Sequence, residues 1–169
     1  APTVCMAFWH TDTYNGNLLG PSGNTVMWCG TDFGPPFDEG YGNNWIEDLD
    51  FTHTVDDNAL SSSVTIEADM HVDVDSGADF LALQYESAAF GWTDIATWNL
   101  QGSVVAVSEA VTYLPPDYTG SGQDEIHLRW RVTTDANTSD QDLGYDSQGA
   151  VQLDNILVTT SNKATYFED

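Results

Sequence analysis

Residues 63–74 alternate between apolar and polar side chains without a break. The apolar positions are Val64, Ile66, Ala68, Met70, Val72 and Val74, and every residue between them is polar or charged. A period of two is typical of a β-strand with one buried and one exposed face. An amphipathic helix would instead repeat its apolar positions about every 3.6 residues. The fold therefore contains a long strand that packs on a hydrophobic core.

The rest of the chain favours strands as well. No window of useful length has the apolar spacing of a helix, and further strands are expected at residues 80–85, 95–100, 103–107 and 126–132. Loops are expected where Gly and Pro cluster, at residues 15–23, 31–44 and 115–123. About nine short strands at fairly regular spacing favour an all-β antiparallel sandwich over a parallel α/β fold.

The last strong strand changes phase in its middle. Val151 and Leu153 keep one phase, whereas Ile156 and Val158 keep the opposite one. One extra residue in a strand has this effect, so the pattern predicts a β-bulge at residues 154–155.

Asp154, beside the predicted bulge, is the strongest single candidate for a metal ligand. A charged side chain in mid-strand needs a compensating partner, and calcium takes about six to eight oxygen ligands. The alternatives are that Asp154 caps the bulge or pairs with Arg129 or Arg131. The acidic loop before this strand is a weaker candidate for a second ion, because it lacks EF-hand spacing and a solvated loop is the simpler interpretation. Its carboxylates are those of Asp135, Asp140, Asp142 and Asp146.

The order of several motifs resembles that of MAM-like jelly-roll domains, including the domain of immune inhibitor A-type secreted metalloproteases. Residues 127–158 resemble the C-terminal part of these domains. The earlier motifs are FWH at 8–10, NTVMWCG at 24–30, NNWIEDLDF at 43–51 and DFLALQYESAAFGW at 79–92. The resemblance covers residues 8–160 and implies a secreted, non-catalytic jelly-roll β-sandwich, often with a structural cation. The chain lacks the family's Ser-Pro after the third element and the four cysteines of animal MAM domains.

The resemblance also implies which residues meet at the cation. In these jelly rolls an N-terminal acidic loop and the last strand often share one ion. Asp12 and Asp32, in the matching HTD and GTD stretches, would then join Asp154 around a structural calcium. We expect one jelly-roll domain over residues 1–161, with residues 162–169 as a C-terminal tail outside the core.

The charge of the chain restricts its partners. Twenty-seven acidic residues and three basic residues give a net charge of -24. Nucleic acid is an unfavourable partner, because phosphate binding needs clustered Lys and Arg. No apolar run reaches the roughly 20 residues that span a bilayer, so no membrane insertion is expected. The acidity fits a solvated surface suited to high salt, or cation binding.

The two cysteines, Cys5 and Cys29, both lie in apolar, strand-like segments. In a secreted chain a disulfide between them is favoured over two buried free thiols. The opening Ala1-Pro2-Thr3 is compatible with the mature end of a secreted protein. Asn137 begins an Asn-Thr-Ser glycosylation sequon.

Catalytic motifs are missing from the sequence. It has neither a GxSxG nor an HExxH motif, and paired carboxylates are expected by chance among 27 acidic residues. We therefore expect a protein that is not an enzyme. Jelly rolls host many carbohydrate-binding modules, in which exposed aromatic side chains stack on sugar rings. The candidates are Trp92, Trp98, Tyr118 and Tyr145, with packing at the edge of the core as the alternative for each.

Two functions remain. One is extracellular binding or adhesion, with a glycan or an extracellular protein as the partner. The other is a structural subunit of an extracellular filament or surface layer, in which terminal segments such as residues 1–8 add a strand to a neighbouring copy.

Overall fold

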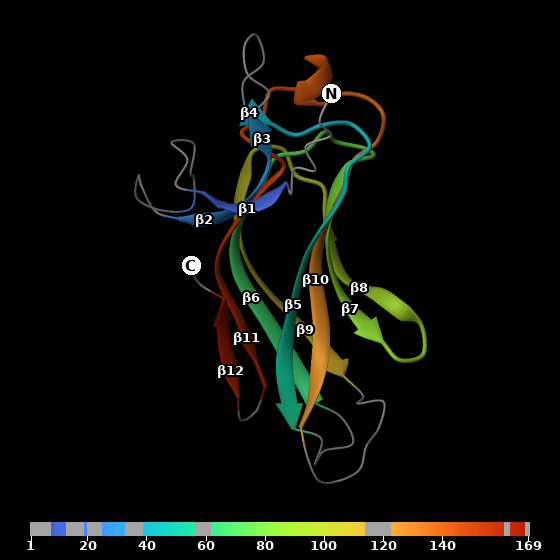
Figure 1. Cartoon of the computed structure of the whole chain (residues 1–169), viewed down its shortest axis with the longest axis vertical. Coiled ribbons are helices and arrows are strands. Elements are labelled where there is room, and N and C mark those ends of the chain that lie inside the picture. The colour runs from blue at the N-terminus through green and yellow to red at the C-terminus, as the bar shows by residue number, and fades with distance from the viewer. Residues whose placement is uncertain are drawn as a thin grey trace, which may run out of the picture.

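Two antiparallel sheets packed against each other form the molecule (Figure 1). The computed structural model describes residues 8–12, 19, 25–32, 39–56, 62–113, 123–160 and 163–167. The larger sheet has the order β1 (Trp9–Asp12), β2 (Val26–Cys29), β11 (Val151–Thr159), β6 (Ser62–Val72) and β9 (Ser103–Tyr113), and β12 (Ala164–Phe167) also pairs with β11. The smaller sheet has the order β5 (Ile46–Asp56), β10 (Gln123–Thr133), β7 (Phe80–Ser87) and β8 (Gly91–Trp98). A short pair, β3 (Thr31–Asp32) and β4 (Glu39–Gly40), and a 3-10 turn, η1 (Asp140–Asp142), lie at one end of the sandwich.

The path of the chain between the sheets is that of a jelly roll. From β5 to β11 the chain crosses to the other sheet at every connection except the β7–β8 hairpin, which stays in the smaller sheet. In space, β2, β11, β6 and β9 therefore oppose β5, β10, β7 and β8, an arrangement built from two Greek keys. The predicted all-β jelly-roll sandwich is confirmed.

The core lies between the two sheets. The even-numbered residues of β6 from 64 to 72 all face it, and none is more than 5% exposed. This confirms the face predicted from the alternation. Trp130 of β10 is fully buried and packs near Trp98 of β8, with 5.6 Å between the ring centroids. An aromatic pair of this size anchors the smaller sheet through its buried area.

The predicted bulge in β11 is present. The register between β11 and β6 shifts between Asp154 and Leu157, and Asn155 has a φ of 52°, a left-handed conformation that Asn tolerates better than most residues. Asp154 accepts a hydrogen bond from the backbone N–H of Asn155 at 2.8 Å. Its carboxylate therefore caps the bulge, which is one of the alternatives left open by the sequence.

The end of the chain differs from the expected tail. Residues 164–167 form β12, which pairs with β11 beyond the bulge. Thr165 lies 2.9 Å from His53 Nδ1 through its hydroxyl oxygen, and Phe167 meets Phe51 with ring centroids 5.0 Å apart. The segment joins the sandwich because its inward residues cover the gap between edge strand β5 and the larger sheet.

Candidate functional site

The outer face of the smaller sheet carries two of the three basic residues in the chain. Arg129 and Arg131 lie on β10 and alternate with Leu128, Trp130 and Val132, which are fully buried. The period of two therefore directs both guanidinium groups away from the core. The chain has a net charge of -24. Within the described part of the smaller sheet, its positive charge is therefore concentrated at Arg129 and Arg131.

The register of the four strands arranges the outward side chains in rows across the sheet. One row contains Asp50, Arg129, Gln84 and Asp94, and the next contains Asp48, Arg131, Ala82 and Thr97. Beyond these, Thr52 pairs in register with His127, and Glu86 with Trp92. His127 Nδ1 lies 3.6 Å from Glu86 Oε2, so these four residues form a third row. We call these three rows the polar face.

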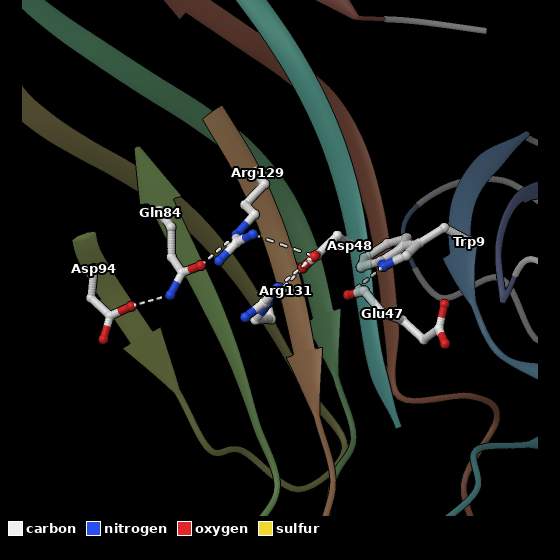
Figure 2. Close-up of polar contacts among 7 residues, drawn as sticks. All are labelled: Trp9, Glu47, Asp48, Gln84, Asp94, Arg129 and Arg131. Carbon is white, nitrogen blue, oxygen red and sulfur yellow. Dashed lines mark hydrogen bonds and ion pairs between the residues drawn. The ribbon is translucent and has the colours of Figure 1, made fainter. Parts of the chain in front are cut away.

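A continuous set of hydrogen bonds fixes the centre of the polar face (Figure 2). Arg131 donates from Nε and Nη2 to the two carboxylate oxygens of Asp48, both at 2.6 Å. Arg129 donates from Nε to Gln84 Oε1 at 2.6 Å, and its Nη1 lies 3.4 Å from the same Asp48 carboxylate. Gln84 in turn donates from Nε2 to Asp94 at 2.6 Å. The contacts cross β5, β10, β7 and β8, so each polar group is held in one orientation.

The forked Arg131–Asp48 pair sets the charge of this network. The hydrogen bonds from Arg131 lower the pKa of Asp48, and the same bonds raise the pKa of Arg131. Burial lowers the pKa of Arg129, whose whole residue is only 7% exposed. Forked Arg–carboxylate geometry provides orientation as well as energy. Asp48 is therefore a carboxylate at neutral pH and holds both guanidinium groups in place.

Edge strand β5, which carries Asp48, is itself held from the side. Trp9 of β1 donates from Nε1 to the backbone carbonyl of Glu47 at 3.2 Å, as Figure 2 shows. Phe8 stacks on Trp45 with ring centroids 3.9 Å apart. These contacts hold the first half of β5 in place. The backbone that carries the Asp48 carboxylate is therefore fixed.

Trp92 supplies an aromatic surface on the polar face. The Arg129 guanidinium lies over its ring, 4.0 Å from the centroid, an arrangement favoured by the negative face of the π-system. Trp92 also lines a surface groove with Asp50, Thr52 and His127. A half-buried aromatic ring beside fixed donors and acceptors suits a ligand with both apolar faces and hydroxyl groups.

The other predicted ligand-binding aromatics have different positions. Trp98 points inward to Trp130. Tyr145 packs near Tyr41 with ring centroids 6.0 Å apart, and its hydroxyl donates to Asp73 at 2.8 Å. Both follow the alternative interpretation, packing at the edge of the core. Tyr118 lies outside the described residues. The sequence had not singled out Asp48, Gln84, Asp94, Arg129 and Arg131 as site residues.

The predicted calcium site at Asp154 is incomplete among the described residues. Asp69 lies opposite Asp154 in register, and it accepts a hydrogen bond from the Asn155 side chain at 2.8 Å. No three His, Cys, Asp or Glu residues come together to hold a metal in the described part of the chain. Two carboxylates are too few for calcium, which takes about six to eight oxygens. The side chains of Asp12 and Asp32 are outside the described set, so their role stays a prediction.

The carboxylates of the acidic loop bind backbone groups. Asp140 is buried and accepts from the N–H groups of Tyr41 and Ser147 at 2.9 and 2.6 Å and from the Ser147 hydroxyl at 2.8 Å. Asp142 accepts from Ser139 N at 3.1 Å in the capping box of η1. Asp135 accepts from the N–H of residue 137 at 2.8 Å. These bonds order the loop. Asp142 and Asp146 are exposed, as in a solvated loop, whereas Asp140 is buried, and a second ion in this loop stays a prediction.

Cys29 is a free thiol in the structure, and because Cys5 lies outside the described residues, the Cys5–Cys29 disulfide stays a prediction. Its side chain points into the core and is fully buried, which raises the pKa of the thiol. Sequence spacing did not reveal which way this side chain faces. Asn137, the sequon residue, is exposed in the loop before β11.

Comparisons of the chain with models of protein families and with curated proteins found no match. The resemblance to MAM-like domains therefore stays a prediction. Within the described residues, no helix has the length and apolar character needed to cross a membrane. Because one fold can host unrelated functions, the function has to be argued from the polar face itself.

Proposed function

We propose that the protein is a non-catalytic, extracellular binding module that recognises a neutral glycan through the polar face. The observation that carries the proposal is the position of Trp92 beside a fixed network of donors and acceptors on one sheet. A sugar ring has apolar faces that stack on an aromatic side chain, and its hydroxyl groups both donate and accept hydrogen bonds. The extracellular location rests on the family resemblance.

The charges of the polar face favour a neutral ligand over an acidic one. Both guanidinium groups are already paired, Arg131 with Asp48 and Arg129 with Asp48 and Gln84. Asp50, Glu86 and Asp94 lie in the same rows, so carboxylates outnumber guanidinium groups there. An anionic sugar would meet like charges that the two Arg side chains do not offset.

Fixed side chains also lower the entropy lost on binding. Ordering a long side chain at an interface costs about 0.5–1.5 kcal/mol. Arg129 and Gln84 are bonded to each other and Arg131 is bonded to Asp48, so folding itself already orders these side chains.

The proposal is tested by screening the protein against a glycan array and measuring each positive ligand by calorimetry. Trp92→Ala should weaken binding by roughly tenfold or more, because truncating an aromatic residue at the centre of a binding site often costs about 2 kcal/mol or more. Phe90→Ala is the matched control, since Phe90 is 86% exposed in the adjacent turn and outside the three rows. Equal loss of affinity in both variants would place the site elsewhere, and an array without ligands would contradict glycan binding.

A second candidate, self-assembly, is favoured by one observation. Strand β9 ends the larger sheet, and its outward residues Val104, Ala106, Ser108, Ala110 and Thr112 are all uncharged. Edge strands with little charge are prone to pair with another chain, and the charge in β9 is that of Glu109, on the phase opposite to these residues. In that case Val104→Lys should abolish assemblies seen by analytical ultracentrifugation, whereas Thr52→Lys on the other sheet should leave them intact. A monomer at all concentrations would exclude this function.

A further inference from the structure

The larger sheet has a break in one of its edges. Strand β6 pairs with one side of β11 along most of its length, so β2 and β12 share the opposite side. β2 pairs with residues 151–153 and β12 with residues 156–159. The bulge at residues 154–155 lies between these two pairings. The wall of the sandwich is therefore interrupted opposite edge strand β5.

A pocket of about 300 Å³ occupies this break. Met27, Phe51, Leu153, Ile156 and Phe167 line it, so apolar side chains from both sheets contribute. A volume near 300 Å³ lies at the small end of the range for sites that bind organic molecules. Phe51 and Phe167 contact each other edge to face, so this side of the pocket is well packed.

The polar groups of this pocket select for positive charge. Asp50 and Asp154 line it, and none of its described lining residues is basic. Tyr166 also lines it and is 65% exposed, so its ring is accessible from solvent. Carboxylates and an accessible aromatic face both attract a cation. An anionic ligand would meet two like charges there, and a purely apolar ligand would leave both carboxylates facing it.

We propose that this pocket binds a small organic cation with an aromatic or branched aliphatic body, of the arylalkylamine class. The apolar body packs against Phe51, Phe167 and Met27, which line the pocket, and the ammonium group is directed to Asp154. Asp50 borders both this pocket and the polar face, whereas the other described lining residues lie outside the three rows. The proposal does not depend on glycan binding.

Tryptamine and tryptophol are suitable probes, because they share an indole and a two-carbon arm and differ in an ammonium or a hydroxyl group. Titration of labelled protein followed by NMR should give a tryptamine Kd in the millimolar range and binding about tenfold or more weaker for tryptophol. Intermolecular NOEs should connect the indole protons with the Met27 methyl group. This readout uses the unaltered protein.

The control has to distinguish binding of tryptamine in the pocket from nonspecific attraction of any cation to an acidic protein. Asp154→Asn keeps an oxygen that can accept the Asn155 N–H bond, and it should weaken tryptamine binding about tenfold while leaving tryptophol unchanged. Glu86→Gln removes the same charge on the other sheet and should leave both affinities unchanged. Equal binding of the two probes, equal effects of the two variants, or the absence of NOEs to Met27 would each overturn the proposal.

Discussion

Removing the Asp48 carboxylate should destabilise the fold by about 2 kcal/mol at neutral pH. A hydrogen bond to a charged group contributes about 1.5–3 kcal/mol, and Arg131 donates two of them at 2.6 Å. The side chains of Arg131 and Asp48 are 28% and 25% exposed, so solvent screens the pair and reduces its contribution to about half. With an m-value of about 2 kcal/mol/M, Asp48→Ala should lower the urea midpoint by about 1 M.

A double-mutant cycle isolates the pair. Asp48→Ala, Arg131→Ala and the double variant should give a coupling energy of about 1–2 kcal/mol at pH 7. Asp50→Ala is the matched control, because Asp50 is an exposed neighbour on the same strand, and it should cost less than about 0.5 kcal/mol.

The coupling energy between Asp48 and Arg131 should also decrease at low pH. Because the hydrogen bonds from Arg131 lower the pKa of Asp48 in the folded state, the stabilisation is present above the unfolded pKa of about 3.9. It is lost as the pH falls further, through the folded pKa. A coupling energy below about 0.5 kcal/mol at pH 7, or one that is unchanged at low pH, would refute the reasoning.

Three further predictions concern the rest of the sandwich. Burial raises the pKa of Asp79 and Asp140, so the folded state binds protons more tightly than the unfolded state. The contribution of these two carboxyl groups to the free energy of unfolding should therefore rise as the pH falls from 7 toward about 4, whereas His53 and His71, whose pKa values are lowered by burial, contribute in the opposite sense. The difference in free energy of unfolding between the wild type and Asp140→Asn should isolate the Asp140 contribution, and a difference that does not change with pH would contradict it. Gly149→Ala should cost about 2 kcal/mol or more in urea unfolding, because φ is +92° and the added Cβ would lie 2.1 Å from Trp28 Nε1; a neutral effect would contradict this packing. Cys29 should react with a thiol reagent only after denaturant is added, and fast labelling of the native protein would contradict its burial.

Features that depend on one strand could be predicted from the sequence. The alternation of residues 63–74 indicated β6 and its core face, because the side-chain period belongs to the strand itself. The reversal of phase beside Asp154 located the bulge for the same reason. Trp92 was named as a candidate together with three other aromatic residues, and its role in binding a ligand stays a prediction.

Features that depend on pairing between strands could not be predicted from the sequence. Asp48 and Arg131 are 83 residues apart in the chain, and only the register of β5 with β10 brings them together. His71 lies on the polar phase of β6, the face that the alternation predicts to be exposed, yet it is 2% exposed. Its neighbour in register, Gln152, is also fully buried. Periodicity separates the two faces of a strand, but it does not show which of them is covered.

The most direct test of the account is to map neutral-glycan binding on the protein by NMR. ¹⁵N-labelled protein would be titrated with the soluble oligosaccharides that the array identifies, or with a broad set of neutral oligosaccharides at millimolar concentration. The account predicts shifts of the Trp92 indole N–H and of the Arg129 and Arg131 side-chain N–H signals, together with backbone shifts along β10, β7 and β8. Shifts confined to the larger sheet, or none at saturating concentrations, would contradict the assignment of the polar face as the binding site.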